Sequence, residues 1–183
     1  DLQLGDTISV LGDGTSDTRV EAQDFSPDSR WIYYTANDDG DFTQLRRFDI
    51  QRRTREDVRS EPWDIVQSRF SEGGRYRIDT IDEDASTEIR IVDASSGRDI
   101  KLPDLPDGEI RNVRFSKSDE KFAFHLNGDR QPNDLYVIDI RGNARALTHS
   151  LNPAIDQDDL VESRVVRFVS FDGTSIPNVL WRP

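Results

Sequence analysis

The chain has no cysteine and no methionine among its 183 residues, and it has only two histidines. Without cysteine, disulfides, thiolate metal sites and a cysteine nucleophile are excluded, and the redox compartment stays open. No apolar run approaches the roughly 18–20 residues that cross a bilayer, so no membrane partner is expected. The chain starts in polar sequence without a signal peptide, which leads us to expect a processed or trimmed N-terminus. The cytoplasm is the favoured location, with the periplasm and secretion left open.

Basic residues are also scarce. The chain has 24 Lys and Arg against 36 Asp and Glu, which gives a net charge of -12. Such a surface repels phosphate, so no nucleic-acid partner is expected. Aspartate outnumbers glutamate by 27 to 9, and arginine outnumbers lysine by 21 to 3. Two interpretations fit this bias. The chain is an ordinary acidic protein from a GC-rich genome, or it is adapted to high salt, where screening removes carboxylate repulsion.

No segment of ten or more residues has a clear helical period, but the sequence repeats itself. A Phe-Ser pair recurs at intervals of 45 residues, at Phe25-Ser26, Phe70-Ser71 and Phe115-Ser116. An alternating segment that ends in an apolar residue and aspartate follows each pair, with the aspartates at Asp49, Asp93 and Asp139. Two markers that recur in register make a chance similarity untenable.

Each repeat reads as four short strands. In the first repeat these are "VEAQDFS", "WIYYTA", "TQLRRFDI" and "REDVRS", separated by turn sequences such as "PDSR" and "NDDGD". In the second repeat, "RDIKLP" is the expected fourth strand. Four strands in 40–50 residues are typical of a β-propeller blade. We expect each repeated Phe to pack between blades and each repeated Ser to cap its turn.

The predicted fold is therefore all-β, a partial β-propeller of four-stranded blades with a C-terminal β segment. The blades span 20–63, 64–108 and 109–156, and residues 1–19, through "TISVLG" at 7–12, supply the last strand of a preceding blade. Three blades do not close a ring, since closed propellers have about four to eight. The chain is then a fragment of a longer protein, one of two copies that join edge to edge, or an arc whose tail completes another blade.

Two segments carry a resemblance to known families. "FSPDSRWIYYT" followed by "LRRFDI" resembles the TolB-like propeller repeat, over residues 20–156. The tail "VVRFVSFDGTSIPNVLWRP" resembles the segment that leads from propeller to catalytic domain in the prolyl oligopeptidase family, in its acylaminoacyl-peptidase and dipeptidyl-peptidase branch. The matching positions are Ser170, Phe171, Asp172, Gly173, Ile176, Pro177 and Pro183.

This resemblance implies that residues 157–183 are a linker and the first strands of an α/β-hydrolase domain. The complete protein would then be a serine peptidase that cleaves short peptides through an acyl-enzyme. The propeller would limit access to small substrates and would contact its own hydrolase domain. The present chain would not be catalytic by itself, and it would stop where it does because the catalytic domain is not included.

No residue is assigned a catalytic, cofactor-binding or metal-binding role. The Gly-x-Ser-x-Gly motif of the family is absent. His125 falls in a second strand and His149 follows a fourth strand, so both are expected to be structural. The acidic run "NDDGDFTQ" departs from a calcium loop, because Gly40 is misplaced and Phe48 occupies the twelfth position. The arginines of "RRFDIQRRTRED" are expected to pair with neighbouring carboxylates.

Two other functions remain open at this point. A TolB-like interaction module would bind a protein partner over its face or by strand addition at an open edge, and no hydrolase domain would follow it. A half-propeller would instead self-assemble through its open blade edges into a homo-oligomer.

Overall fold

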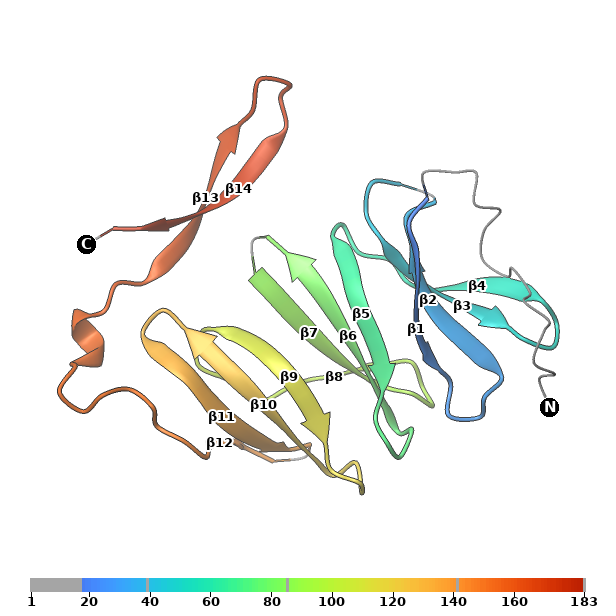
Figure 1. Cartoon of the computed structure of the whole chain (residues 1–183), viewed down its shortest axis with the longest axis horizontal. Coiled ribbons are helices and arrows are strands. Elements are labelled where there is room, and N and C mark those ends of the chain that lie inside the picture. The colour runs from blue at the N-terminus through green and yellow to red at the C-terminus, as the bar shows by residue number, and fades with distance from the viewer. Residues whose placement is uncertain (1–17, 39, 85, 141, 183) are drawn as a thin grey trace, which may run out of the picture.

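The computed structural model describes residues 18–38, 40–84, 86–140 and 142–182 (Figure 1). The strand expected at 7–12 lies outside the described residues. The elements are β1 (Val20–Phe25), β2 (Trp31–Ala36), β3 (Gln44–Asp49), β4 (Thr54–Arg59), β5 (Asp64–Phe70), β6 (Tyr76–Glu83), β7 (Ser86–Asp93), β8 (Asp99–Ile100), β9 (Glu109–Phe115), β10 (Lys121–Gly128), β11 (Gln131–Asp139), β12 (Ala144–Ala146), η1 (Gln157–Asp159), β13 (Ser163–Val169) and β14 (Ser175–Trp181).

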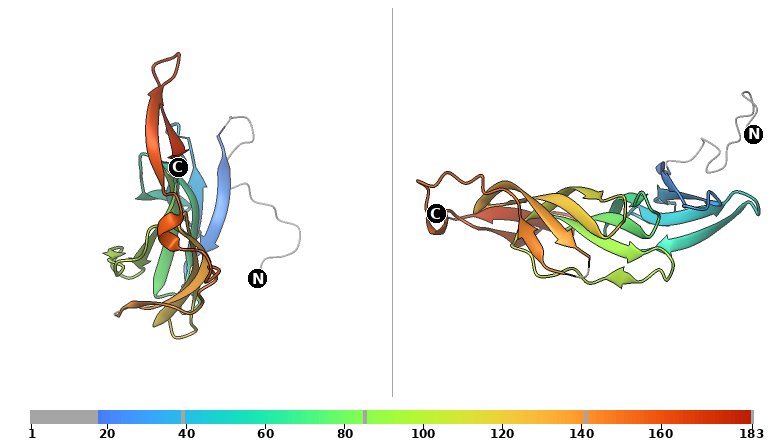
Figure 2. Two further views of the ribbon diagram at one scale, coloured as in Figure 1. Left: turned by 90° about the vertical axis from the view of Figure 1, so that its left-hand side faces the viewer. Right: turned by 90° about the horizontal axis from the view of Figure 1, so that it is seen from below.

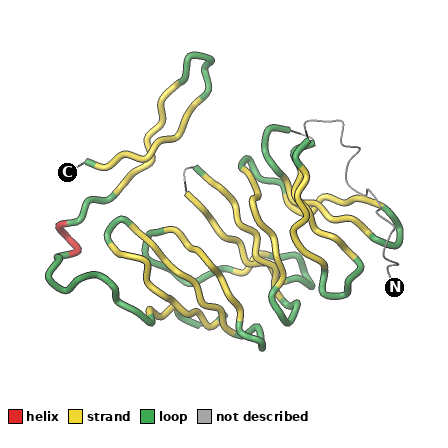
Figure 3. The backbone as a smooth tube through the Cα atoms, in the orientation of Figure 1, coloured by secondary structure: helices red, strands yellow, loops and turns green. Residues whose placement is uncertain are grey.

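The described part of the chain is all-β except for the 3-10 turn η1 (Figure 3). Strands β1–β4 form a first sheet, β5–β8 a second and β9–β12 a third, each an antiparallel meander whose strands pair in chain order. The three sheets follow one another in a row (Figure 1). Strands β13 and β14 form a separate two-stranded hairpin, so the tail does not complete a further four-stranded sheet. No helix in the described ranges is long and apolar enough to cross a membrane.

Both faces of the first sheet carry large apolar side chains, as expected for a blade with neighbours on two sides. In β2, Trp31 and Tyr33 are buried with Ile65 and Ile81 of the second sheet. The next residue, Tyr34, lies in a different buried cluster, because successive residues of a strand point to opposite faces of the sheet. A larger core joins the second and third sheets and comprises Tyr76, Ile78, Ile89, Ile91, Val113, Phe122, Phe124, Leu126, Tyr136 and Ile138.

The repeated phenylalanines lie between sheets at two of the three positions. Phe70 meets the ring of Tyr33 edge-on at 5.0 Å, and Phe115 stacks on Tyr76 at 5.6 Å. Each contact joins one sheet to the next, which confirms the expected role. Phe25 differs, because the residue is 55% exposed.

The repeated serines cap their turns as predicted. Ser26 Oγ accepts a hydrogen bond from Trp31 N at 2.9 Å, Ser71 Oγ from Tyr76 N at 3.1 Å and Ser116 Oγ from Lys121 N at 3.2 Å. In each sheet, this bond joins the residue that follows the first strand to the first residue of the second strand. The hydroxyl therefore closes a short turn that the backbone alone would leave partly unsatisfied.

Two of the repeated aspartates, Asp49 and Asp93, organise the next turn. Asp49 Oδ1 accepts hydrogen bonds from Gln51 N at 3.0 Å and Arg52 N at 2.9 Å. Asp93 accepts from the backbone and hydroxyl groups of Ser95 and Ser96. These bonds, led by the Ser95 hydroxyl, lower the pKa of Asp93 from its ordinary 3.8 to about 2.

One strand is much shorter than the sequence predicts. The segment "RDIKLP" was expected to form a whole fourth strand, but β8 contains only Asp99 and Ile100. Pro103 has no N–H to donate, and the segment 101–108 leaves β7 to reach the third sheet. The outer edge of β7 is thus only partly paired.

Candidate functional site

The C-terminal hairpin is attached to the turns at one end of the second and third sheets. Its two strands pair from Ser163–Trp181 to Val169–Ser175. The β6–β7 turn contributes Asp84, and the β10–β11 turn contributes Asp129 and Arg130. We call these three residues the tip face. Two views show the hairpin extending beyond the sheets at this end (Figures 1 and 2).

Asp129 fixes the base of the hairpin. Its Oδ2 accepts a hydrogen bond from Ser163 N at 2.6 Å, and its Oδ1 accepts one from Trp181 Nε1 at 3.0 Å. Ser163 and Trp181 are also partners across the two strands, so one carboxylate binds both at once. The hydrogen bonds from Ser163, with that from Trp181, lower the pKa of Asp129 below its ordinary value.

The neighbouring Arg130 fixes the linker that precedes the hairpin. Its guanidinium donates from Nε to Gln157 O at 3.1 Å, from Nη2 to Asp158 at 2.9 Å and from Nη1 to Glu162 at 3.0 Å. These three contacts span the short turn η1 and the residue before β13. A planar guanidinium suits such a fork of acceptors, and its two carboxylate partners favour its charged form.

A third contact reaches the second sheet. Arg167 of β13 forms an ion pair with Asp84, and its guanidinium lies 6.0 Å from the centre of the Trp63 ring. Asp84 has a positive φ of 49°, which brings it to the apex of a tight turn. The hairpin therefore contacts two successive sheets through their turns, and this attachment orients it relative to the propeller.

The hairpin presents apolar side chains to solvent. Phe171 is fully exposed, Val169 is 73% exposed and Phe168 is 53% exposed, and Val165, Val179 and Trp181 are also exposed. Val165 and Phe168 lie on opposite faces of β13, since side chains alternate along a strand. An isolated two-stranded hairpin is marginally stable in water, so this apolar surface needs covering.

A buried ionic cluster lies between the first and second sheets. Asp79 is fully buried and accepts two hydrogen bonds from Arg77, each at 2.7 Å. It also accepts one from Arg59 Nε at 3.0 Å and one from the Ser68 hydroxyl at 2.8 Å. Arg59 comes from β4, so the cluster ties that strand to the next sheet. Both carboxylate oxygens of Asp79 are thus hydrogen bonded within the protein, and we interpret the cluster as structural.

The two histidines lie in different surroundings. His125, in β10, has its Nδ1 3.4 Å from Asn112 Nδ2 of the neighbouring strand β9. His149 follows β12 and lies near the carboxylate of Asp134. Burial acts to raise the pKa of Asp134, but hydrogen bonds from Thr148 and Ser150, with the nearby histidine, lower it below its ordinary value. No described contact links either histidine to a serine hydroxyl. The serines of "ASSGRD" instead hydrogen bond to Asp93.

The acidic and arginine-rich runs pair with each other. Arg46 forms ion pairs with Asp38 and Asp57, and Arg47 pairs with Glu56 at 2.6 Å. Arg47 also lies over the Trp31 ring at 4.0 Å. These pairs agree with the expected role of the arginines. Within the described ranges, no three His, Asp or Glu side chains are grouped so that they could hold a metal ion.

The chain resembles segments of known propellers. Two structures of prolyl oligopeptidase B from Galerina marginata, each bound to a 35mer hydrolysis and macrocyclization substrate, align with TM-scores of 0.68 at 18% identity. The alignments cover 87% and 92% of this chain but only 23% of those chains. TolB from Acinetobacter baumannii aligns with a TM-score of 0.55 at 19% identity, over 86% of this chain and 43% of that one.

The fold is that of a β-propeller segment. At this level of identity the likeness establishes the fold alone. No protein-family model matches the sequence, and no curated protein matches it either. The chain spans about a quarter of the length of the prolyl oligopeptidases to which it is similar.

Sequence reasoning missed the residues of the tip face. Asp84 and Asp129 lie in polar hairpin turns that look like any solvated turn, and their partners are 83 and 34 residues away. The only local signal is a polar turn between two well-formed strands. Asp79 was missed for a similar reason, because an aspartate inside a strand becomes recognisable only when its arginine partners are known.

Proposed function

We propose that this chain is the propeller portion of a serine peptidase of the prolyl oligopeptidase family. In this proposal the blades restrict access to a catalytic domain that follows the C-terminal hairpin. The tip face orients that domain, and the complete protein cleaves short peptides. The chain described here contributes the gate and no catalytic residue.

The exposed apolar hairpin carries the proposal. Phe168, Val169 and Phe171 would cost free energy if they stayed in water, at roughly 25 cal/mol for each Å² of apolar surface. A sheet that continues from β13 and β14 would cover them and pair their edges. The tail sequence resembles the opening strands of an α/β-hydrolase domain, which supplies such a sheet.

The extent of the structural likeness gives further support. An alignment that covers 92% of the chain cannot be reached by residues 1–156 alone. It therefore extends into the C-terminal segment, beyond the repeats that all propellers share. TolB covers 86% of this chain, close to the 87% of the other prolyl oligopeptidase B structure, but with a lower TM-score of 0.55 against 0.68.

A second function has its own supporting observation. Phe25 is exposed on the outer face of the first sheet, where its counterparts Phe70 and Phe115 are packed against aromatic rings. A non-enzymatic TolB-like module could use this face to hold another protein. A second copy of the chain could use it to close a ring. In both cases the chain would work without a hydrolase domain.

A mechanism-based serine reagent tests the leading proposal. A fluorophosphonate probe should label the product of the complete natural reading frame with one equivalent, and heat-denatured protein should stay unlabelled. The 183-residue chain, expressed alone, should not react. Stoichiometric labelling of the 183-residue chain would contradict the proposal that it contributes no catalytic residue. Failure of the complete protein to react would favour the interaction module, and a stable dimer of the chain would favour self-assembly.

A further inference from the structure

The outer edge of β7 is covered along only part of its length. Strand β7 pairs with β6 through all eight of its residues, from Ser86 to Asp93. On its other side it pairs with β8 only at Ile91 and Val92. The remaining half of this edge has no neighbouring strand among the described residues.

The hydrogen-bond pattern identifies which backbone groups are left. Asp93 N donates to Arg98 O, which places the backbone groups of Asp93 on the outer edge. Backbone N–H and C=O groups point to alternate edges along an antiparallel strand. The backbone groups of Ile91 and Ile89 are therefore also on the outer edge of β7. Ile91 is opposite Ile100 in β8, but no described backbone hydrogen bond joins Ile89 to the segment that follows.

A side chain partly substitutes for the missing strand. Arg90 Nη1 lies 3.4 Å from Ile89 O and donates to it, which is a long hydrogen bond. The same guanidinium pairs with Glu83 at 3.3 Å and Glu88 at 3.2 Å. The Ile89 carbonyl is thus available to a better donor, such as the N–H of an added strand.

In the described part of the chain, the first sheet does not have this opening, and in the third sheet the outer edge of β11 is covered from Leu135 to Ile138 but not over residues 131–134. In the first sheet, β4 continues to Arg59, which pairs with Leu45 at the far end of β3. In the third sheet, Leu147 N donates to Leu135 O and so extends the cover beyond β12. In the second sheet the cover of β7 reaches back only to Ile91, because the chain leaves at Lys101 for the third sheet.

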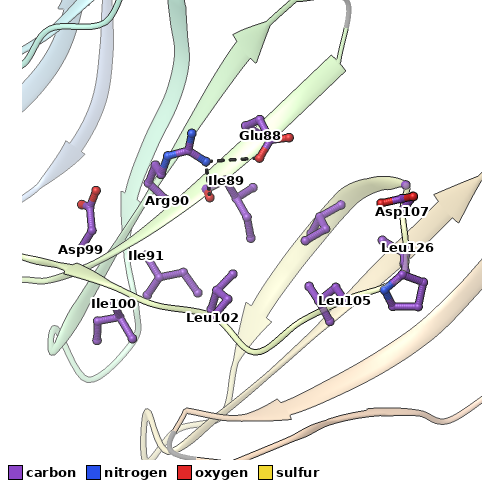
Figure 4. Close-up of a pocket in the computed structure, with 13 residues that line it drawn as sticks. Glu88, Ile89, Arg90, Ile91, Asp99, Ile100, Leu102, Leu105, Asp107 and Leu126 are labelled. Carbon is purple, nitrogen blue, oxygen red and sulfur yellow. Dashed lines mark hydrogen bonds and ion pairs between the residues drawn. The ribbon is translucent and has the colours of Figure 1, made fainter. Parts of the chain in front are cut away.

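A groove lies beside this edge, between residues of the second and third sheets. It has a volume of ≈ 400 Å³ and runs between β7 and the segment 101–108 (Figure 4). Its apolar lining comes from Ile89, Ile91, Ile100, Leu102, Leu105, Ile110 and Leu126. Aliphatic side chains thus lie beside unpaired backbone groups, which is the combination that binds an extended peptide.

The charges around the groove favour a basic ligand. Glu88, Asp99 and Asp107 line it, and Arg90 is the one basic residue among its lining residues. Arg90 pairs with Glu83 and Glu88, and Asp99 pairs with Arg59, whereas no described ion pair includes Asp107. The chain as a whole carries a net charge of -12. A peptide with lysine or arginine beside its aliphatic residues would be attracted to this rim.

We propose that the outer edge of β7 is a strand-addition site for an extended peptide with aliphatic residues flanked by basic ones. The peptide backbone pairs with Ile89, and its aliphatic side chains enter the groove beside Leu102 and Leu105. This site is separate from the tip face. The proposed strand-addition site does not depend on a catalytic domain that follows the hairpin.

A peptide titration followed by NMR tests the proposal on the full chain. The probe is the acetylated and amidated pentapeptide Lys-Ile-Thr-Ile-Lys. In the free protein, the Ile89 amide should exchange with solvent at least about tenfold faster than the Ile91 amide, which is paired. Saturating peptide should slow exchange at Ile89 and leave Ile91 unchanged.

Two N-methylated versions of the peptide separate strand addition from simple apolar binding. One is methylated at the two isoleucines and the other at the threonine, so each blocks only one edge of the added strand. One of them should bind at least about tenfold more weakly and the other should bind like the parent, because hydrogen bonds are lost on one edge only. Equal binding by all three peptides would overturn the proposal.

A matched pair of charge reversals tests the rim. Asp107→Lys should weaken binding about threefold or more, whereas Asp104→Lys, with the same change of charge outside the groove, should leave it unchanged. Both side chains are exposed, so the fold should persist. Absence of binding at millimolar peptide, or equal loss in both variants, would contradict the proposal. So would a dimer of the chain in which Ile89 is already protected.

Discussion

Asp119 of the third sheet completes a turn of the second sheet at the position where Gly73 has no side chain. Its Oδ2 accepts hydrogen bonds from the Ser71 hydroxyl at 2.7 Å and from Arg75 N at 3.1 Å. Its Oδ1 accepts one from Gly73 N at 3.2 Å. A Cβ on Gly73 would lie 2.5 Å from Asp119 Oδ2, so the glycine makes room for the carboxylate.

The first sheet meets the same need within its own turn. Asp28, 45 residues before Gly73, accepts hydrogen bonds from the Ser26 hydroxyl at 2.5 Å and Arg30 N at 3.1 Å. The second repeat lacks this aspartate and borrows one from the next sheet. The hydrogen bonds that stay within one blade in the first repeat thus connect two blades in the second repeat.

We predict that Gly73 and Asp119 are thermodynamically coupled. Gly73→Asp should destabilise the chain by about 2 kcal/mol, because the new side chain overlaps Asp119. Asp119→Gly should cost a similar amount through lost hydrogen bonds, while its positive φ of 57° suits glycine. The double variant recreates the arrangement of the first sheet and should cost less than the sum. Urea unfolding of all four proteins gives the coupling energy, and strict additivity would show that the contact is not cooperative.

We predict that Asp79 contributes far more to the stability of the fold than Asp99, which is another carboxylate partner of Arg59. Asp79→Asn removes the charge that balances Arg77 and Arg59 in a buried position, and this should cost about 3–5 kcal/mol. Asp99→Asn removes a more exposed partner of Arg59 and should cost about 1 kcal/mol or less. Equal losses in thermal or urea unfolding would mean that the cluster is not effectively desolvated.

The lowered pKa of Asp93 predicts a pH-dependent contribution to stability. Its folded pKa of about 2 lies below the ordinary 3.8, so the carboxylate stabilises the fold at pH values above 3.8. The contribution is lost as the pH falls from 3.8 through about 2. Asp93→Asn should therefore be less stable than the parent at pH 6, with the difference shrinking below pH 4. A difference that stays constant down to pH 2 would assign the effect to shape and not to charge.

Salt should distinguish the two interpretations of the acidic composition. The net charge of -12 produces repulsion that salt screens, whereas exposed ion pairs such as Arg47–Glu56 become weaker. If the chain is adapted to high salt, its melting temperature should rise between about 0.1 M and about 2 M KCl. An unchanged or falling melting temperature would identify an ordinary acidic protein.

The repeats made most of the fold predictable. The 45-residue spacing of Ser26, Ser71 and Ser116 reports a local turn, and local hydrogen bonds leave a clear pattern in sequence. The length of β8 was overestimated because "RDIKLP" looks like an ordinary polar strand, whereas the chain leaves β7 after Ile100 to reach the third sheet. The borrowed Asp119 and the tip-face residue Asp129 were missed because their partners are distant in the chain. Side-chain contacts between blades depend on geometry that no local pattern encodes.

The most direct test of the central claim is to sequence the source gene beyond the codon for Pro183. The proposed function predicts a continuing frame that encodes Gly-x-Ser-x-Gly, followed by an aspartate and then a histidine, in an α/β-hydrolase segment. A stop codon directly after Pro183 would contradict it. The exposed hairpin and the exposed Phe25 would then have to be covered by a partner or by a second copy of the chain.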